Sequence, residues 1–221
     1  MKLTLEQRAS LVASKGIFLG GPIDIFEDAG RKTFMLMLDQ GLMPENRVID
    51  VGCGCLRNGY WLIHFLQEGN YFGIEPNISM VAAGRDIIVG EDVISLKKPV
   101  FDNNDRFNFM VFSSKFDMFL ARSIWTHASK HQIEVMLDGF TRTAAVGAKL
   151  LTSIHEALTK EHDYIGTSWV GLSHESVQPG MVAHSLAWIE QVCAARALKV
   201  SCIRDRAFDI ADQTWLVIER E

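Results

Sequence analysis

Along most of the chain, short apolar runs alternate with longer amphipathic segments. An apolar run of about four to eight residues between turn signals is typical of a buried strand, whereas apolar positions spaced three and four apart predict an amphipathic helix. Five segments follow the first pattern and are expected to be strands: 48–52, 71–75, 98–103, 116–123 and 148–155. Six segments follow the second pattern and are expected to be helices: 4–15, 28–42, 59–69, 78–89, 131–144 and 185–197.

Capping residues mark the limits of the second predicted helix. Asp28 is expected to be its N-cap, because a short acidic side chain can accept hydrogen bonds from the first free backbone N–H groups. Pro44 follows the last apolar position and is expected to stop the helix.

The end of the chain follows a different pattern. Residues 156–183 hold glycine, serine, histidine and proline without clear periodicity, and a loop of that length is usually functional. The alternating segments 198–205 and 213–221 are expected to form a closing antiparallel pair. Strands that alternate with helices predict an α/β fold with a doubly wound, mostly parallel sheet and helices on both faces. Ligands of such sheets bind beyond the carboxyl ends of the strands.

The composition is that of a soluble globular protein, with 221 residues, 48% hydrophobic, 22% charged and a net charge of −5. The acidic balance argues against a nucleic-acid partner, since nucleic-acid binders usually carry a basic face. Lys2, Glu6 and Arg8 interrupt the apolar stretch of an export signal, and no run approaches the roughly 18 apolar residues of a membrane span. Four cysteines in a chain this long do not indicate a disulfide framework, so we expect a cytoplasmic protein.

A glycine-containing loop follows the first predicted strand. Gly52 and Gly54 can turn tightly and let the backbone approach a ligand. The dinucleotide fingerprint needs a third glycine where this chain has Arg57, which disfavours a pyrophosphate loop and hence a nicotinamide-dependent reductase. Glu75 ends the next predicted strand, where a carboxylate can accept both hydroxyls of a ribose. The combination predicts an adenosine-type ligand without a required diphosphate.

Four segments together resemble the Rossmann-like (class I) S-adenosylmethionine-dependent methyltransferases, in particular bacterial enzymes that act on small molecules. The segments are VIDVGCGCLRNG at 48–59, YFGIEPN at 71–77, FDMFLARSIWTHAS at 116–129 and GAKLLTSIH at 147–155. The resemblance spans roughly residues 20–221. It implies a seven-stranded sheet with the last strand antiparallel, and S-adenosyl-L-methionine as the cofactor.

The resemblance also implies which residues contact the cofactor. The glycine loop would line the methionine part, Glu75 would hold the ribose, and residues 102–104 would meet the adenine edge. The complete expected set is Asp50, Gly52, Cys53, Gly54, Arg57, Asn58, Glu75, Pro76, Asn77, Asp102, Asn104, Ala121, Arg122 and Ser123. Many relatives have a glycine where this chain has Leu56, so the loop is expected to close differently there.

Histidines at predicted strand ends are candidates for the general base that a hydroxyl acceptor would need. His127 follows the fourth predicted strand and His155 ends the fifth, so either is a candidate catalytic residue. Trp125, Trp169 and His184 are expected to contact the acceptor. Each of these side chains has an ordinary alternative, as a packing residue or a hydrogen-bonded structural histidine.

No metal site is expected. Cys53 with Cys55, and His127 with His131, offer two close ligands each, whereas a structural zinc site needs four. The expected function is methyl transfer from S-adenosyl-L-methionine to a small-molecule acceptor, at a hydroxyl oxygen rather than a nitrogen. The alternatives are an N-methyltransferase, a protein methyltransferase and a non-catalytic S-adenosylmethionine-binding domain. No nucleic-acid or membrane partner is expected, and the sequence does not indicate an oligomeric state.

The motif spacing predicts a single domain over residues 1–221. Its expected parts are an N-terminal helical cover at 1–47, a cofactor-binding core at 48–155, an acceptor loop at 156–183, and a closing helix and strand pair at 184–221. Because loops at strand ends vary while the scaffold persists, the acceptor loop should carry the selectivity.

Overall fold

The structure is a computed structural model that describes residues 3–171, 180–208 and 211–220. The chain divides into two compact units, Met1–Asn104 and Asp105–Glu221, and each is described by itself below. The stretch 172–179, part of the predicted acceptor loop, lies outside the described residues. Among the described residues, no helix is both long enough and apolar enough to cross a membrane.

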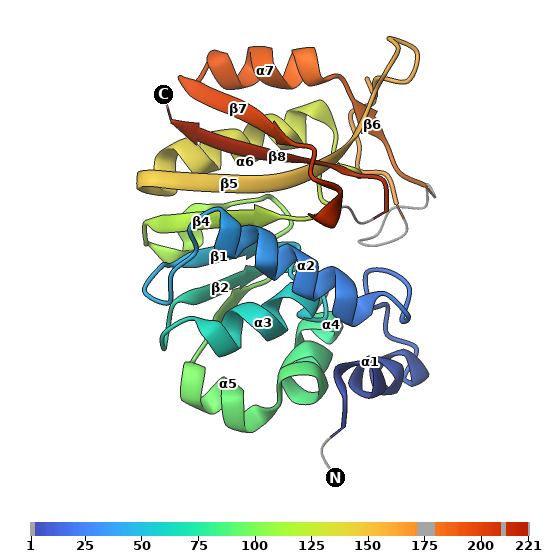
Figure 1. The fold of residues 1–221 in the computed structure, drawn as a ribbon, viewed down its shortest axis with the longest axis vertical. Helices are drawn as coiled ribbons and strands as arrows, with labels where there is room; N and C mark the ends of the chain where they lie inside the picture. Colours follow the sequence, from blue (N-terminus) through green and yellow to red (C-terminus); the bar gives the residue numbers. More distant parts are fainter. Residues whose placement is uncertain (1–2, 172–179, 209–210, 221) are drawn as a thin grey trace. The chain divides into compact units, whose positions relative to one another are not determined.

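The first unit contains three parallel strands in the order β3-β2-β1, of which β1 and β2 are labelled in Figure 1. Strands β1 (Val48–Val51) and β2 (Tyr71–Ile74) are buried at every position, as their largely apolar sequences predict, and in β1 the burial includes Asp50. Strand β3 (Val100–Asp102) is half-exposed, which explains why its sequence signal is weaker. The register pairs Asp50 with Gly73, so the two strands end together.

Six helical segments accompany these strands. They are α1 (Leu5–Ser14), α2 (Phe26–Asp39), α3 (Arg57–Phe65), α4 (Ile78–Ala83), the π-helical segment η1 (Gly84–Val89) and α5 (Glu91–Lys97). The single helix predicted over 78–89 is therefore an α-helix followed by a π-helical turn. The π-helical turn begins at Gly84, which approaches the glycine loop closely, as described below.

The predicted N-cap of α2 is wrong. The N-cap is Ile25, and it makes no side-chain cap hydrogen bond. The helix starts two residues before Asp28 because Phe26 is fully buried and belongs to the apolar face. Asp28 instead lies in the first turn, where a negative charge is favourable beside the helix dipole.

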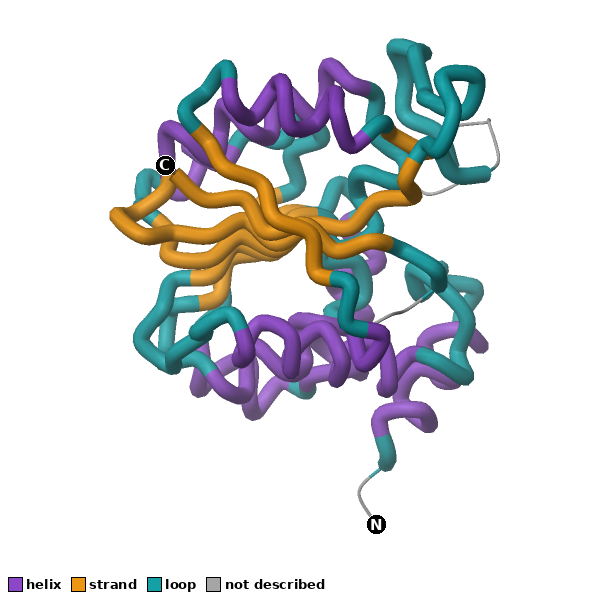
Figure 2. Tube along the Cα trace, turned by 45° about the horizontal axis from the view of Figure 1, so that its top comes forward, coloured by secondary structure: helices purple, strands orange, loops and turns teal. Residues whose placement is uncertain are grey.

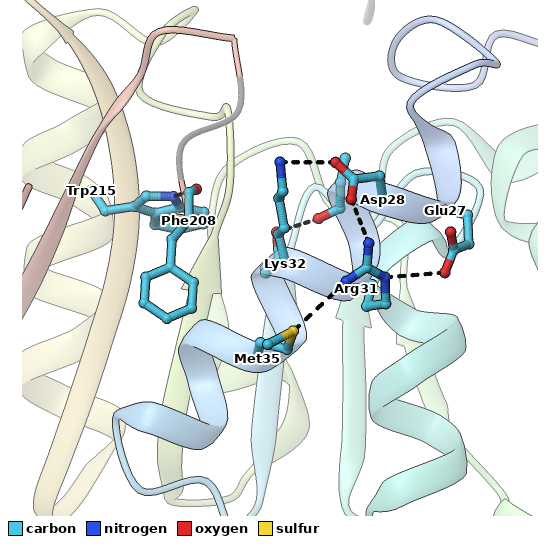
Figure 3. A network of polar contacts seen from close by, with 9 residues as sticks. Glu27, Asp28, Arg31, Lys32, Met35, Phe208 and Trp215 are labelled. Carbon is cyan, nitrogen blue, oxygen red and sulfur yellow. Dashed lines mark hydrogen bonds and ion pairs between the residues drawn. The ribbon is translucent and has the colours of Figure 1, made fainter. Parts of the chain in front are cut away.

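Asp28 also belongs to a group of charges along the exposed side of α2 (Figure 3). Arg31 contacts Asp28 at 2.6 Å and Glu27 at 3.3 Å, and Lys32 contacts Asp28 at 3.0 Å. These are i,i+3 and i,i+4 pairs on a solvated face, each contributing about 0.2–0.5 kcal/mol. The acidic start of the segment therefore stabilises the helix through its first turn rather than through capping.

The second unit contains β4 (Phe116–Ala121), β5 (Ala144–Glu156), β6 (Ala183–His184), β7 (Leu198–Ile203) and β8 (Thr214–Arg220). Strand β5 pairs in parallel with β4 and with the two-residue β6. The last strand, β8, pairs antiparallel with both β5 and β7, which confirms the predicted closing pair.

Helices α6 (Lys130–Thr143) and α7 (Leu186–Ala194) pack against strands β5 and β7 of the same unit (Figure 2). The described part of this unit also contains two 3-10 turns, η2 (Phe109–Phe112) and η3 (Arg206–Phe208). Helix α6 begins with a capping box in which Ser129 and Gln132 bond each other's backbone. Beneath it, the buried rings of Phe116, Phe119 and Phe140 meet edge to face at 4.9–5.6 Å.

Candidate functional site

The glycine loop after β1 turns back toward the end of β2. Gly52 and Gly54 have φ of 70° and 53°, a region that favours glycine. The N–H groups of Gly52 and Cys53 both donate to the carbonyl oxygen of Ile74, at 2.8 and 3.1 Å. A Cβ on Gly54 would lie 3.2 Å from Cε of Met80. The loop is therefore held by backbone bonds in a shape that its two glycines permit.

Glu75 joins this loop to the end of β2. Its Oε2 accepts a hydrogen bond from the Gly54 N–H at 3.0 Å, and its Oε1 accepts one from the Asn77 N–H at 2.9 Å. The side-chain amide of Asn103 donates to the Glu75 carbonyl at 2.7 Å. Glu75 is only 1% exposed, and its carboxylate accepts hydrogen bonds from two backbone N–H groups that the turn holds in place. The structure thus brings together the glycine loop and the acid that the sequence placed after the second strand.

Leu56 shows how the loop closes without a third glycine. It adopts the left-handed conformation, with φ 60° and ψ 37°, and is the N-cap residue of α3. Its side chain is fully buried. A Cβ on Gly59 would lie 2.9 Å from Leu56 Cδ2, and one on Gly84 would lie 2.7 Å from Leu56 Cγ. The departure from the family pattern is therefore accommodated by two glycines that make room for the leucine.

Asp50, at the end of β1, is a buried acid beneath the loop. Tyr71 donates its hydroxyl to Oδ2 of Asp50 at 2.8 Å, while Oδ1 has no hydrogen-bond partner among the described residues. Burial raises the pKa of Asp50 from 3.8 to about 7. The Tyr71 hydrogen bond opposes this rise, the negative Glu75 adds to it, and Arg57 opposes it. Asp50 can therefore change its protonation state near neutral pH.

Two further predicted cofactor residues begin α3. Burial lowers the pKa of the Arg57 guanidinium, whose Cζ lies 6.0 Å from the ring centroid of Phe26. Asn58 is 8% exposed, and its Oδ1 has no hydrogen-bond partner among the described residues. Beside them, burial raises the pKa of the Cys53 thiol well above its ordinary value, which makes it an unreactive packing group.

The ends of β2 and β3 are shaped by side chains that bond their own backbone. Asn77, after Pro76, caps α4 by accepting from the N–H groups two and three residues on, at 3.1 and 3.2 Å. Oδ1 of Asp102 accepts from both the backbone and the side-chain amide of Asn104, at 2.9 and 2.5 Å. These predicted ligand residues therefore have a visible turn-forming role, and their contact with a cofactor stays a prediction.

In the second unit, the end of β4 carries a buried polar network. Ser123, after Ala121, has a left-handed φ of 56° and donates its N–H to Oγ of Ser153 at 2.8 Å. Gln213 accepts from Ser153 Oγ at 2.7 Å and donates to Ser123 Oγ at 2.7 Å. Arg122 donates to the same hydroxyl at 3.1 Å. The network joins the ends of β4 and β5 to the start of β8.

His127 is held by residues of the predicted acceptor loop. Its Nδ1 lies 2.7 Å from the Val170 carbonyl oxygen, which can only accept, so Nδ1 carries the proton and the lone pair of the neutral ring is on Nε2. The ring stacks on Trp169 at 5.4 Å, and Trp169 stacks on Phe107 at 6.3 Å. A Cβ on Gly171 would lie 2.6 Å from His127 Nδ1. Only glycine fits beside this hydrogen bond.

His184 lies in a closed aromatic environment. It is fully buried, its Nε2 donates to the Ala128 carbonyl at 3.0 Å, and the rings of Tyr164 and Trp188 lie 6.3 and 5.8 Å away. Burial lowers the pKa of His184, and the Ala128 carbonyl opposes that shift. This geometry favours the structural alternative for His184 over acceptor contact.

Two other predicted site residues of the second unit, Trp125 and His155, each have a buried ring nitrogen without a hydrogen-bond partner among the described residues. Trp125 is fully buried, and its indole N–H has no hydrogen-bond partner among the described residues. His155 is half-buried at the end of β5, and its Nε2 is likewise buried without a partner in the described part of the chain. Their assigned roles stay predictions.

Gln213 and Ser153 are two buried polar residues of the network at the end of β4 that the sequence does not single out. Ser153 lies in the last part of β5 and Gln213 directly precedes β8, but their partnership crosses 60 residues and no local spacing reveals it. No group of three histidine, cysteine, aspartate or glutamate side chains able to hold a metal is found among the described residues.

No protein-family model matches the chain. Among solved structures, magnesium protoporphyrin IX methyltransferase ChlM from Synechocystis PCC 6803 with bound SAH is 16% identical, with a TM-score of 0.60 over 88% of this chain and 83% of that one. The glycopeptide N-methyltransferase MtfA complexed with S-adenosyl-L-methionine is 11% identical, with a TM-score of 0.63 over 87% and 94%. An O-methyltransferase family protein from Burkholderia thailandensis is 15% identical, with a TM-score of 0.58 over 89% and 59%.

The chain has the class I methyltransferase fold. This confirms the fold class expected from the four motif segments. At these identities the likeness establishes the fold alone, and the three proteins are methyltransferases of different kinds.

Proposed function

We propose that the chain is an S-adenosyl-L-methionine-dependent methyltransferase acting on a hydroxyl of a small molecule. The observation that carries this proposal is the 3.0 Å hydrogen bond from the Gly54 N–H to the buried carboxylate of Glu75. It fixes a loop with two positive-φ glycines against an acid, in a fold whose neighbours include enzymes solved with SAM or SAH. A carboxylate has capacity for more than two donors, so ribose hydroxyls are suitable partners.

The hydrogen-bonding groups around the glycine loop fit this cofactor. Asp50 Oδ1 and Asn58 Oδ1 are buried acceptors without hydrogen-bond partners in the described structure, and an amino acid's ammonium group offers three donors. Gly52 and Gly54 leave the backbone open to close approach. We therefore assign Asp50, Asn58 and the glycine loop to the methionine part, and Glu75 to the ribose.

The cofactor supplies an activated methyl group, and the protein's task is to align the acceptor, exclude water and accept a proton. We propose His127 for the last task. Its Nδ1–H bond to the Val170 carbonyl leaves the lone pair of the neutral ring on Nε2. After Nε2 takes a proton, the same carbonyl stabilises the cationic ring through Nδ1–H. His155 is the second candidate, with a buried Nε2.

A turnover assay tests this proposal. The full chain is incubated with S-adenosyl-L-methionine and pooled phenols, sugars, hydroxy acids and amines, and release of S-adenosylhomocysteine is measured by mass spectrometry. We expect turnover with a hydroxyl acceptor, reduced about 10²- to 10⁴-fold in His127→Ala. His131→Ala, on helix α6, is the matched control and should retain full activity.

Other outcomes would replace parts of the proposal. Loss of turnover in His155→Ala but not in His127→Ala would assign the base to His155. Turnover only with amines would indicate an N-methyltransferase. Tight cofactor binding without turnover of any acceptor would favour a non-catalytic sensor.

A further inference from the structure

The N-terminal helix α1 shares a core with the glycine loop. Leu5, Ala9 and Val12 of α1 belong to one buried apolar cluster with Cys55 of the loop. The Cys55 thiol also donates to the carbonyl of Phe18 at 3.1 Å. The segment before α2 is therefore part of the packing that surrounds the loop.

Arg8 makes polar contacts from α1 within this packing. One nitrogen, Nη1, lies 2.8 Å from the Ile88 carbonyl, 3.2 Å from that of Val89 and 3.4 Å from that of Ile87. These carbonyls end the π-helical segment η1, where helical carbonyl groups lack partners in the next turn. A cation at a helix C-terminus is favourable for the same reason. Arg8 is thus positioned to fix the end of η1.

The other end of η1 touches the glycine loop directly. A Cβ on Gly84 would lie 2.9 Å from the carbonyl carbon of Cys55, 3.0 Å from its oxygen and 2.7 Å from Leu56 Cγ. The backbone of η1 therefore contacts the loop with no space between them. Single π-helical turns are rare and occur frequently at functional sites.

We infer that Arg8 is a positioning residue for cofactor binding, which acts through η1 on the glycine loop. Arg8 holds the carbonyl end of η1, and η1 holds Cys55 and Leu56 through the contact at Gly84. Arg8 belongs to the first helix, more than 40 positions before the loop on which it acts. We expect the effect at the amino-acid end of the cofactor. This step of the inference rests on the function proposed above.

Isothermal titration of the full chain with S-adenosylhomocysteine and, separately, with adenosine tests this inference. In Arg8→Ala, we expect affinity for S-adenosylhomocysteine to fall about tenfold, the size of one lost charge-assisted hydrogen bond. Affinity for adenosine, which lacks the amino-acid end, should change less than about threefold. Arg8→Lys keeps a cation that reaches carbonyl groups and should recover most of the loss.

Gln7→Ala is the matched control, because Gln7 lies on α1 next to Arg8 and its side chain forms the capping box with Thr4 at the start of that helix. It should leave both affinities near those of the wild type. Unchanged S-adenosylhomocysteine affinity in Arg8→Ala would overturn the inference, as would an equal loss for both ligands, which indicates general destabilisation.

A second readout separates this inference from the proposed function. Hydrogen exchange of the unliganded chain should be faster at the amides of residues 52–58 in Arg8→Ala than in Gln7→Ala. If the wild type binds neither ligand, the proposed function fails. Hydrogen exchange still tests whether Arg8 stabilises the glycine loop through η1. Equal exchange in the two variants would contradict it.

Discussion

At Leu56, we expect glycine to lower the free energy of unfolding less than alanine does, which is the reverse of the order found inside helices. The residue is fully buried and left-handed, with φ 60°. Leu56→Ala removes buried apolar volume, which costs about 2–5 kcal/mol, and keeps the unfavourable conformation. Leu56→Gly loses the same packing but relieves the left-handed strain of about 1–2 kcal/mol. Glycine also makes the unfolded chain more flexible, which lowers the free energy of unfolding by about 0.4–1 kcal/mol.

We therefore expect Leu56→Gly to be more stable than Leu56→Ala, by up to about 1.6 kcal/mol. Leu62 is the control, because it is equally buried but lies inside α3. There glycine should be about 1 kcal/mol worse than alanine. Urea unfolding followed by circular dichroism gives all four free energies of unfolding. If alanine is more stable than glycine at both positions, the left-handed strain assigned to Leu56 is refuted.

Three further outcomes follow from the buried polar groups. Asp50 has a pKa raised from 3.8 to about 7, so the folded chain binds more protons than the unfolded chain in that window, and its stability should fall as pH rises from about 4 to 7. Because asparagine does not titrate, Asp50→Asn should lack this pH-dependent part of the free energy of unfolding, which is about 4 kcal/mol at most for a shift of about three pH units. Urea titrations at several pH values measure it. Gly171→Ala should lower the melting temperature and shift the ring NMR signals of His127, since the new Cβ would lie 2.6 Å from Nδ1; an unchanged His127 signal would contradict this contact. Gln213→Ala leaves the hydroxyls of Ser123 and Ser153 without their shared partner and should cost about 1–3 kcal/mol in thermal or urea unfolding, whereas a loss below about 0.3 kcal/mol would argue against the network.

Strands and the acid after the second strand were predictable because their signals are local. The segments 48–51 and 71–74 are short and largely apolar, which predicts buried strands, and Glu75 directly follows the second. The N-cap of α2 was not predictable in the same way. The burial of Phe26 against other parts of the fold outweighed the capping preference of Asp28.

The remaining differences arise from contacts between residues far apart in sequence. The π-helical turn after α4 begins at Gly84, which lies against Cys55, and the sequence of that segment alone fits an ordinary helix. Gln213 acquires its role from Ser123, which precedes it by 90 residues. Such partners are determined by the strand order, so they become visible only once the fold is known.

Equilibrium binding of S-adenosyl-L-methionine to wild type and Glu75→Gln tests the central claim most directly. The substitution keeps the size of the side chain but removes its charge and one acceptor oxygen, at the acid that bonds the Gly54 N–H. Glu68→Gln, at an exposed acid paired with Lys98, is the control. Circular dichroism at the titration temperature confirms that all three proteins are folded. We expect saturable binding by wild type and the control, and an affinity about 10- to 100-fold weaker in Glu75→Gln. No binding by wild type at hundreds of micromolar, or equal affinities in all three, would contradict the account.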